Sequence, residues 1–412
     1  MSDVFLGIVL NDKACSTGLL SPGNAGLDDL RDNDGEIFRY PSYLAIDTGS
    51  GQVCGGNEAL EMQGLPGVIV LHKMVSLFYS GFSLDVQDHA YTADELMGMF
   101  LKSLAGRCAD LAGVSGFTGM GICIDGLNAV SYDRLKKVIA SIGMNPGHVL
   151  IMNSQESFAY YMLHKKREYW NQGTMLFDYE DGRLETYELK PYLQYKPVIV
   201  QIQRNLVEEN CPPSDNWFAE TGGHLLAGGR CRSAFLYGSG FEDHSWAREF
   251  KKVVSNDNKR KIFQDANLFA RGAAYGGMDA YTDFDQFNYT IICDERISID
   301  VWLEAEHEGR NVKLQLASAG SNCYECRSST VLELIEESTL ELCIRNTGSP
   351  KAITDKEVIN LADFVSDQRK RTKVRMTVLF LKDDRMTVRV EDLGFGEIYP
   401  STGKVFQRTY TV

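Results

Sequence analysis

The sequence predicts a mixed α/β protein followed by an antiparallel β-sandwich, and three observations support this fold class. Two candidate β-hairpins of the same form, at 4–20 and 174–189, lie about one domain's length apart and suggest an internal duplication. Strand and helix patterns alternate from residue 118 to residue 166, which indicates parallel strand pairing in a mixed sheet. From residue 281 to residue 412 period-two alternation dominates, as it does in antiparallel sheets.

The overall composition restricts the class of protein. A chain of 412 residues is long enough for two or three domains. The net charge of -14 argues against general nucleic-acid binding, because Lys and Arg must displace the phosphate counterions. The apolar run from Val4 to Leu10 is too short for a signal peptide or a membrane span, so we expect a cytoplasmic protein with no membrane contact. Ten scattered cysteines fit buried side chains in a reducing compartment.

The two hairpins carry the strongest local signals. In the second hairpin, Asp181-Gly182 lies between two alternating runs, and both central residues of a type I′ turn need positive φ. The first hairpin reverses at Asn11–Asp12–Lys13. A single strand is expected over 38–47, and a turn with a short strand over 49–56.

Capping signals place the helices that follow. Thr92 and Glu95 form a capping box, which predicts a long helix from this point. Ser131 is the expected N-cap of a second helix, which should end at Gly143. The other expected elements are strands at 118–125, 148–153, 196–203 and 233–243 and helices at 156–166, near 224–230, from about 244 and at 265–280.

The last 130 residues predict a separate β-domain. About six short alternating runs are separated by turn signals, and Asp383-Asp384 joins two of them. Such a pattern is typical of a sandwich of two antiparallel sheets.

Several segments of the first 280 residues carry a family resemblance. They are FRYPSYLAID with CGGNEALE, TADELMGMFLKSLAGRCADLAG, the run from ICIDGLNAV to QESFAYYML, FLYGSG, and DANLFARGAAYGG. In sequence and order they resemble the nucleotide-binding domain of the 70-kDa heat-shock chaperones, within the actin-like ATPase superfamily. The resemblance implies two duplicated lobes with mixed sheets and flanking helices: lobe I at 1–170 and lobe II, with a reduced upper subdomain, at 171–283. The β-sandwich at 284–412 resembles the chaperones' substrate-binding domain only in position and class.

The sequence departs from this family at the phosphate-binding loops. The family's first hairpin carries an Asp and hydroxyl residues that hold metal-bound water and phosphate, whereas this chain has Val9 to Lys13 there. In the second hairpin Glu180 and Asp181 replace two glycines of the family's run, and only Gly182 remains. A carboxylate about 4 Å from a phosphate costs about 1 kcal/mol per unit charge in water and about 4 at an effective dielectric near 20. This arrangement opposes phosphate binding unless a divalent cation intervenes.

The resemblance still implies candidate site residues. The candidate nucleotide cleft consists of Asp178, Gly182, Gly238, Ser239 and Gly240, and the candidate catalytic residues are Lys73 and Asp178. Each has a structural alternative: Asp181-Gly182 as a hairpin turn alone, the glycines at 238 and 240 as a strand-to-helix turn, and Lys73 as a surface or ion-paired lysine. A metal site formed by Asp178, Glu180 and Asp181 is a further alternative.

Two other motifs were considered. Cys323-x-x-Cys326 could form part of a zinc or redox site with Cys343 and His307, although residues three apart on a strand point to opposite faces. The basic run 368–373 precedes a strand and is interpreted as a solvated loop.

The leading functional hypothesis is a pseudo-ATPase that serves as a binding or scaffold module for a protein or peptide partner. It requires no cofactor, no metal and no catalytic activity. The alternative is a Mg-ATP-binding ATPase with a non-standard phosphate site, in which Asp178 and Lys73 act around the cation. A third hypothesis, a metal- or redox-dependent enzyme, depends on the cysteine pair.

Overall fold

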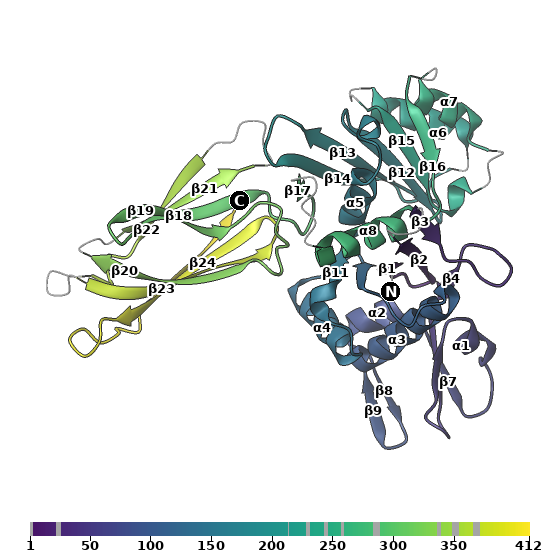
Figure 1. Ribbon diagram of the computed structural model, residues 1–412, viewed down its shortest axis with the longest axis horizontal. Helices are drawn as coiled ribbons and strands as arrows, with labels where there is room; N and C mark the ends of the chain where they lie inside the picture. Colours follow the sequence, from purple (N-terminus) through teal and green to yellow (C-terminus); the bar gives the residue numbers. More distant parts are fainter. Residues whose placement is uncertain are drawn as a thin grey trace. The chain divides into compact units, whose positions relative to one another are not determined.

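A computed structural model provides the structure of the protein (Figure 1). It describes residues 3–21, 26–212, 214–227, 231–242, 246–256, 259–282, 289–335, 339–347, 354–365 and 371–412. The chain divides into two compact units, of which the first comprises Met1–Pro191 and Ile202–Phe287 and the second Tyr192–Gln201 and Asn288–Val412. None of the helices within the described ranges combines the length and apolar character needed to cross a membrane.

The first unit contains two larger sheets with the same strand order. The strands of one sheet run β11-β10-β1-β2-β3, with β4 also paired to β2, and those of the other run β16-β15-β12-β13-β14. Their bounds are β1 Phe5–Val9, β2 Ala14–Ser21, β3 Gly26–Asp29, β4 Arg39–Pro41, β10 Gly119–Cys123, β11 Val149–Met152, β12 Thr174–Glu180, β13 Arg183–Tyr192, β14 Val198–Glu208, β15 Ser233–Tyr237 and β16 Lys261–Gln264. In each sheet two parallel strands lie beside an antiparallel hairpin, which confirms the predicted mixed α/β class and both hairpins.

Helix α8 (Leu268–Thr282) packs directly on the first sheet, against β1, β2 and β10. A Cβ atom on Gly7 or on Gly121 would lie 1.9 Å from a backbone oxygen of this helix. Only glycine at these sheet positions permits so close an approach of the helix.

Side chains cap the N-termini of four of the other helices, which are α3, α4, α5 and α6. The bounds of these and the remaining helices are α1 Asn57–Glu61, α2 Met74–Ser80, α3 Ala93–Ala112, α4 Ala129–Ser141, α5 Ser154–Leu163, α6 Asp215–Leu226 and α7 Arg248–Ser255. The capping box of Thr92 and Glu95 is present at the start of α3, as predicted. The predicted N-cap of α4 at Ser131 is wrong: Asn128 caps the helix, because its Oδ1 accepts hydrogen bonds from two amides of the first turn.

Three further predictions need correction. The single strand predicted over 38–47 is divided at Ser42 into β4 and β5 (Tyr43–Asp47), which belong to different sheets. The helix predicted near 224–230 is α6, which Ser214 caps about ten residues earlier; 228–230 lie outside the described residues. The helix predicted from about 244 is α7, which begins at Arg248; 243–245 likewise lie outside the described residues.

Smaller sheets complete the first unit. One has the order β6-β5-β7, and β8 pairs with β9. The bounds are β6 Val53–Gly55, β7 Val68–His72, β8 Ser83–Val86 and β9 His89–Thr92. The short strand at β6 was predicted, whereas the sequence analysis did not identify β7, β8, β9, α1 or α2.

The second unit is the predicted antiparallel sandwich. Its sheets have the orders β19-β18-β21-β22 and β20-β23-β24-β25, and side chains from both form one hydrophobic core. The bounds are β17 Tyr289–Ile292, β18 Ile299–His307, β19 Arg310–Ala317, β20 Arg327–Ile335, β21 Thr339–Asn346, β22 Thr354–Asn360, β23 Arg371–Lys382, β24 Arg385–Gly394 and β25 Val405–Thr411. The two sheets contain eight described strands instead of about six, and β17 pairs with Val198–Gln201 of β14.

The structure corrects the loop predicted for the basic run 368–373. Arg371, Thr372 and Lys373 form the start of β23, so the loop prediction is wrong for these residues. Residues 368–370 lie outside the described part of the chain.

Candidate functional site

The first unit contains a cavity of about 830 Å³ at the turns of both hairpins and the carboxyl ends of β10, β12 and β15. Ligand sites of α/β proteins commonly occupy such strand ends. Its charged lining comprises seven carboxylate residues, Asp125, Asp178, Glu180, Asp181, Glu185, Glu209 and Glu242, and four cations, Lys13, Arg39, Arg183 and Arg204. The excess of carboxylates gives the cavity a negative field, which disfavours a polyanionic ligand.

The turns of the two hairpins are joined by an ion pair. Asp181 and Gly182 have φ of 52° and 78°, as the predicted type I′ turn requires. The Lys13 ammonium, on the first hairpin, donates a hydrogen bond to the Asp181 carboxylate and this bond raises the lysine pKa. Both side chains are more than half exposed and line the cavity.

The turn after β15 presents its amide to a carboxylate. The Ser239 N–H donates to Glu180 Oε2 at 2.7 Å. Gly238 has φ of 97°, and a Cβ there would lie 2.3 Å from the Tyr179 carbonyl oxygen. A Cβ on Gly240 would lie 2.0 Å from the Tyr179 ring. Packing against Tyr179 therefore accounts for both glycines without a ligand.

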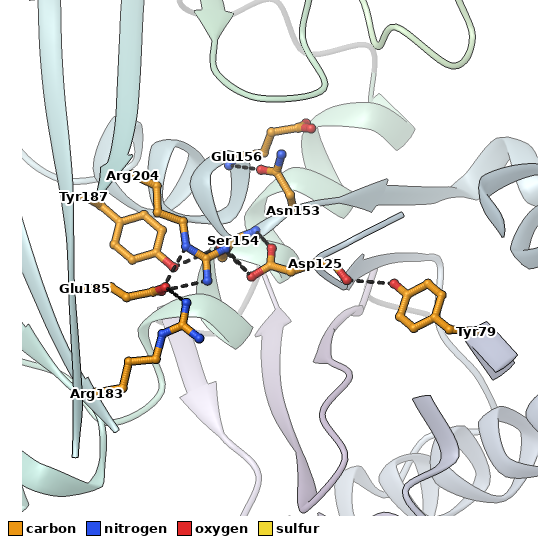
Figure 2. A network of polar contacts seen from close by, with 9 residues as sticks. All are labelled: Tyr79, Asp125, Asn153, Ser154, Glu156, Arg183, Glu185, Tyr187 and Arg204. Atoms are coloured by element: carbon orange, nitrogen blue, oxygen red, sulfur yellow. Dashed lines mark hydrogen bonds and ion pairs between the residues drawn. The ribbon is translucent and has the colours of Figure 1, made fainter. Parts of the chain in front are cut away.

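Arg204 connects the ends of two strands across the cavity (Figure 2). Its Nη1 lies 2.7 Å from Asp125 Oδ2, and its Nη2 lies 2.7 Å from Glu185 Oε2. Glu185 is almost fully buried and also accepts a hydrogen bond from Arg183. The guanidinium thus links the carboxyl end of β10 to the strand pair β13–β14.

Asp125 also binds the first turn of α5 (Figure 2). Its two carboxylate oxygens accept from the Ser154 N–H at 2.8 Å and from the Ser154 hydroxyl at 2.9 Å. The buried Tyr187 hydroxyl donates to the same serine at 3.1 Å, and Tyr79 donates to the Asp125 carbonyl at 2.7 Å. The helix amide that an external anion would use is already hydrogen-bonded.

The region around Lys73 follows the same pattern. Asp12 Oδ1 accepts from the Ser76 N–H of α2 at 2.9 Å, and the hydroxyl of the same serine donates to its other oxygen. Lys73 precedes this helix with a left-handed backbone, its φ being 58°. Its side chain is exposed and is not among the residues that line the cavity.

Asp178 is the carboxylate with the most perturbed pKa in the cavity. It lies directly opposite Glu185 in the β12–β13 register. Its Oδ1 is sealed from solvent and has no hydrogen-bond partner in the described part of the chain. Burial, together with the charges of Glu185 and Glu180, raises the pKa of Asp178 to about 8. The side chain is therefore mostly protonated at pH 7.

The structure brings together part of the predicted cleft. Asp178, Gly238 and Ser239 line the cavity, while Gly182, Gly240 and Lys73 do not. The sequence analysis missed Asp125 and Arg204. Asp125 could have been found, because it is the last residue of the parallel strand predicted at 118–125. No local pattern marks Arg204, whose partners lie 79 and 19 residues away.

The cysteine motif belongs to the second unit's core. Cys323 is buried in that core, and Cys326 packs against the same cluster. Within the described ranges, no group of three or more His, Cys, Asp or Glu side chains has an arrangement suited to a metal ion.

Comparison with known families gives one match in each of two successive parts of the chain. A domain described as "Domain of unknown function (DUF8552)" matches residues 296–412, and no curated protein matches the chain. A family described as "Family of unknown function (DUF5716) C-terminal" matches residues 30–294, which is more than half of the sequence. The chain therefore belongs to the family of unknown function DUF5716, C-terminal.

Proposed function

We propose that this protein is a chaperone-like actin-fold pseudo-ATPase, which serves as a binding or scaffold module for a protein or peptide partner. The shared strand order of the two sheets in the first unit supports an actin-like, duplicated architecture. The position of the cavity, at the turns of both hairpins, corresponds to where such a fold would hold a nucleotide. The chemistry of the cavity is the argument for loss of that role.

The observation that carries the proposal is that the cavity's anion-binding groups are bound to the chain's own carboxylates. The amides at Ser154 and Ser239 donate to Asp125 and Glu180, and the Lys13 ammonium binds Asp181. A triphosphate would have to displace these carboxylates and then remain beside them, at a cost of several kcal/mol for charges about 4 Å apart in a partly buried site. The nucleotide thus fits these residues poorly.

The two candidate catalytic residues also favour this proposal over an active ATPase. Lys73 is absent from the cavity lining. With no cation bound, the pKa of Asp178 is about 8, so Mg²⁺ would have to displace a proton from this carboxyl at neutral pH. Neither residue offers what Mg-ATP hydrolysis requires at neutral pH.

A titration with Mg-ATP at pH 7, followed by thermal unfolding and by calorimetry, tests the proposal. A ligand at 100 times its dissociation constant would stabilise the protein by about 2.7 kcal/mol. We expect no saturable shift for the wild-type chain. Saturable stabilisation at micromolar to millimolar Mg-ATP would contradict the proposal and favour the ATPase alternative.

A matched variant tests the reason for the loss. In Glu180→Gln with Asp181→Asn, both side chains keep their shape but lose their charge, so the Ser239 amide and Lys13 become available to an anion. We expect this variant to bind inorganic pyrophosphate more tightly than the wild type does. Equal, negligible binding by both proteins would show that the two carboxylates are not what excludes phosphate.

A further inference from the structure

The outward side of the sheet β20-β23-β24-β25 has an unusual charge. Alternate residues of β23 point away from the core: Arg371, Lys373 and Arg375 are exposed, whereas Val374 and Met376 are fully buried. The same alternation holds along β20, β24 and β25. We call the outward side of this sheet the basic face.

The charges on this face are predominantly positive. Six cationic side chains, Arg327, Arg371, Lys373, Arg375, Arg385 and Arg389, stand against two carboxylates, Glu333 and Glu391. The difference is four positive charges on one sheet of a chain whose net charge is -14. A local field of this sign attracts acidic partners.

Half of these cations lack a carboxylate partner among the described residues, although the Lys373 ammonium lies 5.6 Å from the centroid of the Phe395 ring. Arg371 pairs with Glu333, while Arg375 and Arg389 share Glu391. Arg327, Lys373 and Arg385 form no ion pair within the part of the chain that the structure describes. These side chains are therefore available to carboxylates of another molecule.

The basic face is also hollowed and partly apolar. A depression of about 460 Å³ lies among Arg327, Arg375 and Arg389, with Leu379 and Leu381 on its floor and rim. Exposed apolar side chains on the same side of the sheet are Val331, Ile335, Leu381 and Val405, which are between 49% and 55% exposed. Arginine beside apolar side chains is typical of the residues that dominate protein interfaces.

We propose that the basic face binds an extended segment of a partner protein in which acidic and apolar residues alternate. The register places Arg389 beside Thr377, and Arg375 beside Val331 and Glu391, so guanidinium groups lie next to uncharged side chains of neighbouring strands. Planar guanidinium groups bind carboxylates bidentately, and the apolar positions accept the intervening side chains.

The size of the face supports a segment and not a globular domain. Four strands of seven to twelve residues, about 4.8 Å apart and rising about 3.3 Å per residue, cover roughly 600 Å². A stable interface between two folded proteins needs about 800 Å² on each side. An extended peptide of about eight residues matches the available area.

The composition of the face favours a protein segment over nucleic acid. The described outward positions on the four strands are not aromatic, and the Phe395 ring beside Lys373 is half-buried, so the face offers bases no row of open rings on which to stack. The exposed valine, isoleucine and leucine side chains cannot donate hydrogen bonds to a phosphate backbone. The acidic remainder of the chain would also repel a long polyanion.

The inference rests on the proposed function only in taking the partner to be a protein, and its test is independent of nucleotide. The probe is a fluorescein-labelled ten-residue peptide that alternates glutamate with valine, and the control peptide alternates lysine with valine. Fluorescence anisotropy with the full chain should show saturable binding of the acidic peptide that weakens between 50 and 300 mM salt, as exposed charges are screened. The basic peptide should not bind to this face.

Charge reversal locates the binding. Arg327→Glu with Arg385→Glu should weaken the acidic peptide at least about tenfold, since neither residue has an internal partner to lose. The matched control, Lys102→Glu with Arg310→Glu, changes the net charge equally at exposed positions elsewhere and should leave the affinity within about twofold.

Besides failure of the acidic peptide to bind, two results would overturn the inference. One is equal binding of the acidic peptide by both double variants, and the other is tighter binding of a single-stranded oligonucleotide or of anionic lipid vesicles than of the peptide. Binding of Mg-ATP in the separate titration would refute the pseudo-ATPase proposal and leave this result unaffected. Failure of the peptide to bind would refute the basic-face inference alone.

Discussion

The cavity of the first unit and the basic face of the second differ in whether their cationic side chains have carboxylate partners within the chain. In the cavity, Lys13, Arg183 and Arg204 are each bound to a carboxylate of the chain itself. On the basic face, Arg327 and Arg385 have no such partner among the described residues. Charges that are internally paired hold the fold together, whereas charges left unpaired are available to another molecule. The cavity, which the family resemblance emphasises, is therefore the poorer candidate for recognition.

The difference follows from how each region is built. Segments far apart in the sequence meet at the cavity, so a cation there can find a carboxylate from another strand or turn, as Arg204 does with Asp125. On a sheet face the neighbours are fixed by the register. Where Thr377 and Gln407 flank Arg389, no rearrangement supplies a second carboxylate.

The largest expected effect is a loss of stability on removing Arg204, and it tests whether the paired charges of the cavity stabilise the fold. Arg204→Ala leaves the buried Glu185 beside only Arg183, so we expect unit 1 to lose about 3 kcal/mol of stability, less than a fully buried pair because Arg204 is 29% exposed. The matched control, Arg183→Ala, removes a half-exposed partner of the same carboxylate and should cost less than about 1 kcal/mol. Urea unfolding and hydrogen exchange in β10 and β13 measure the two losses. Equal losses would contradict the assignment.

The next effect concerns the glycines of the cavity. Gly238→Ala places a Cβ against the Tyr179 carbonyl at a φ of 97°, and we expect a loss of about 2 kcal/mol. Gly182→Ala also has positive φ but meets open space, so it should cost about 1 kcal/mol. Thermal unfolding of both variants distinguishes close packing from turn conformation. A larger loss at Gly182 would show that the turn, and not contact with Tyr179, is the stricter requirement.

The buried Asp178 carboxyl should make the stability of the folded protein depend on pH. Its pKa is raised in the folded protein from 3.8 to about 8, so the folded state binds more protons than the unfolded state between those values. Wild-type stability should therefore fall as pH rises from about 4 to about 8. Asp178→Asn removes this term, so the variant should gain stability relative to the wild type as the pH rises from 5 to 8.5.

Unfolding of both proteins at the two pH values measures this margin. A difference between wild type and Asp178→Asn that does not change with pH would mean that the carboxyl is already ionised in the folded protein. The cavity would then hold one more negative charge than we assign to it.

Local patterns in the sequence were sufficient for much of the fold. The Asp181-Gly182 turn and the Thr92 capping box depend only on residues next to each other, and both are present as predicted. The N-cap of α4 was misplaced because two cap-forming residues lie three apart, and Asn128 and not Ser131 takes that position. The division of the 38–47 strand at Ser42 depends on two different sheets, which no local pattern reveals.

The candidate site was less accessible to sequence analysis for the same reason. Glu180 and Asp181 could be recognised as acidic replacements in a turn, but their partners, Ser239 and Lys13, come from other parts of the chain. The basic face could not be predicted from the sequence for a different reason. Its run 368–373 looked like a solvated loop, because the charges that alternate along a strand become a surface only when neighbouring strands add theirs.

The smallest expected effect on stability comes from a change at Glu391, on the basic face. Glu391 is the carboxylate shared by Arg375 and Arg389, and it is 28% exposed. Glu391→Gln should change the unfolding free energy by no more than about 1 kcal/mol, because partly exposed ion pairs contribute little. It should nevertheless tighten binding of the glutamate–valine peptide by about twofold to fivefold, since two guanidinium groups become available to the ligand. Anisotropy titrations at 50 mM salt measure the change. If the variant binds the peptide more weakly, Glu391 organises the arginines for binding instead of competing with the ligand, and the unpaired cations are not what makes this face different from the cavity.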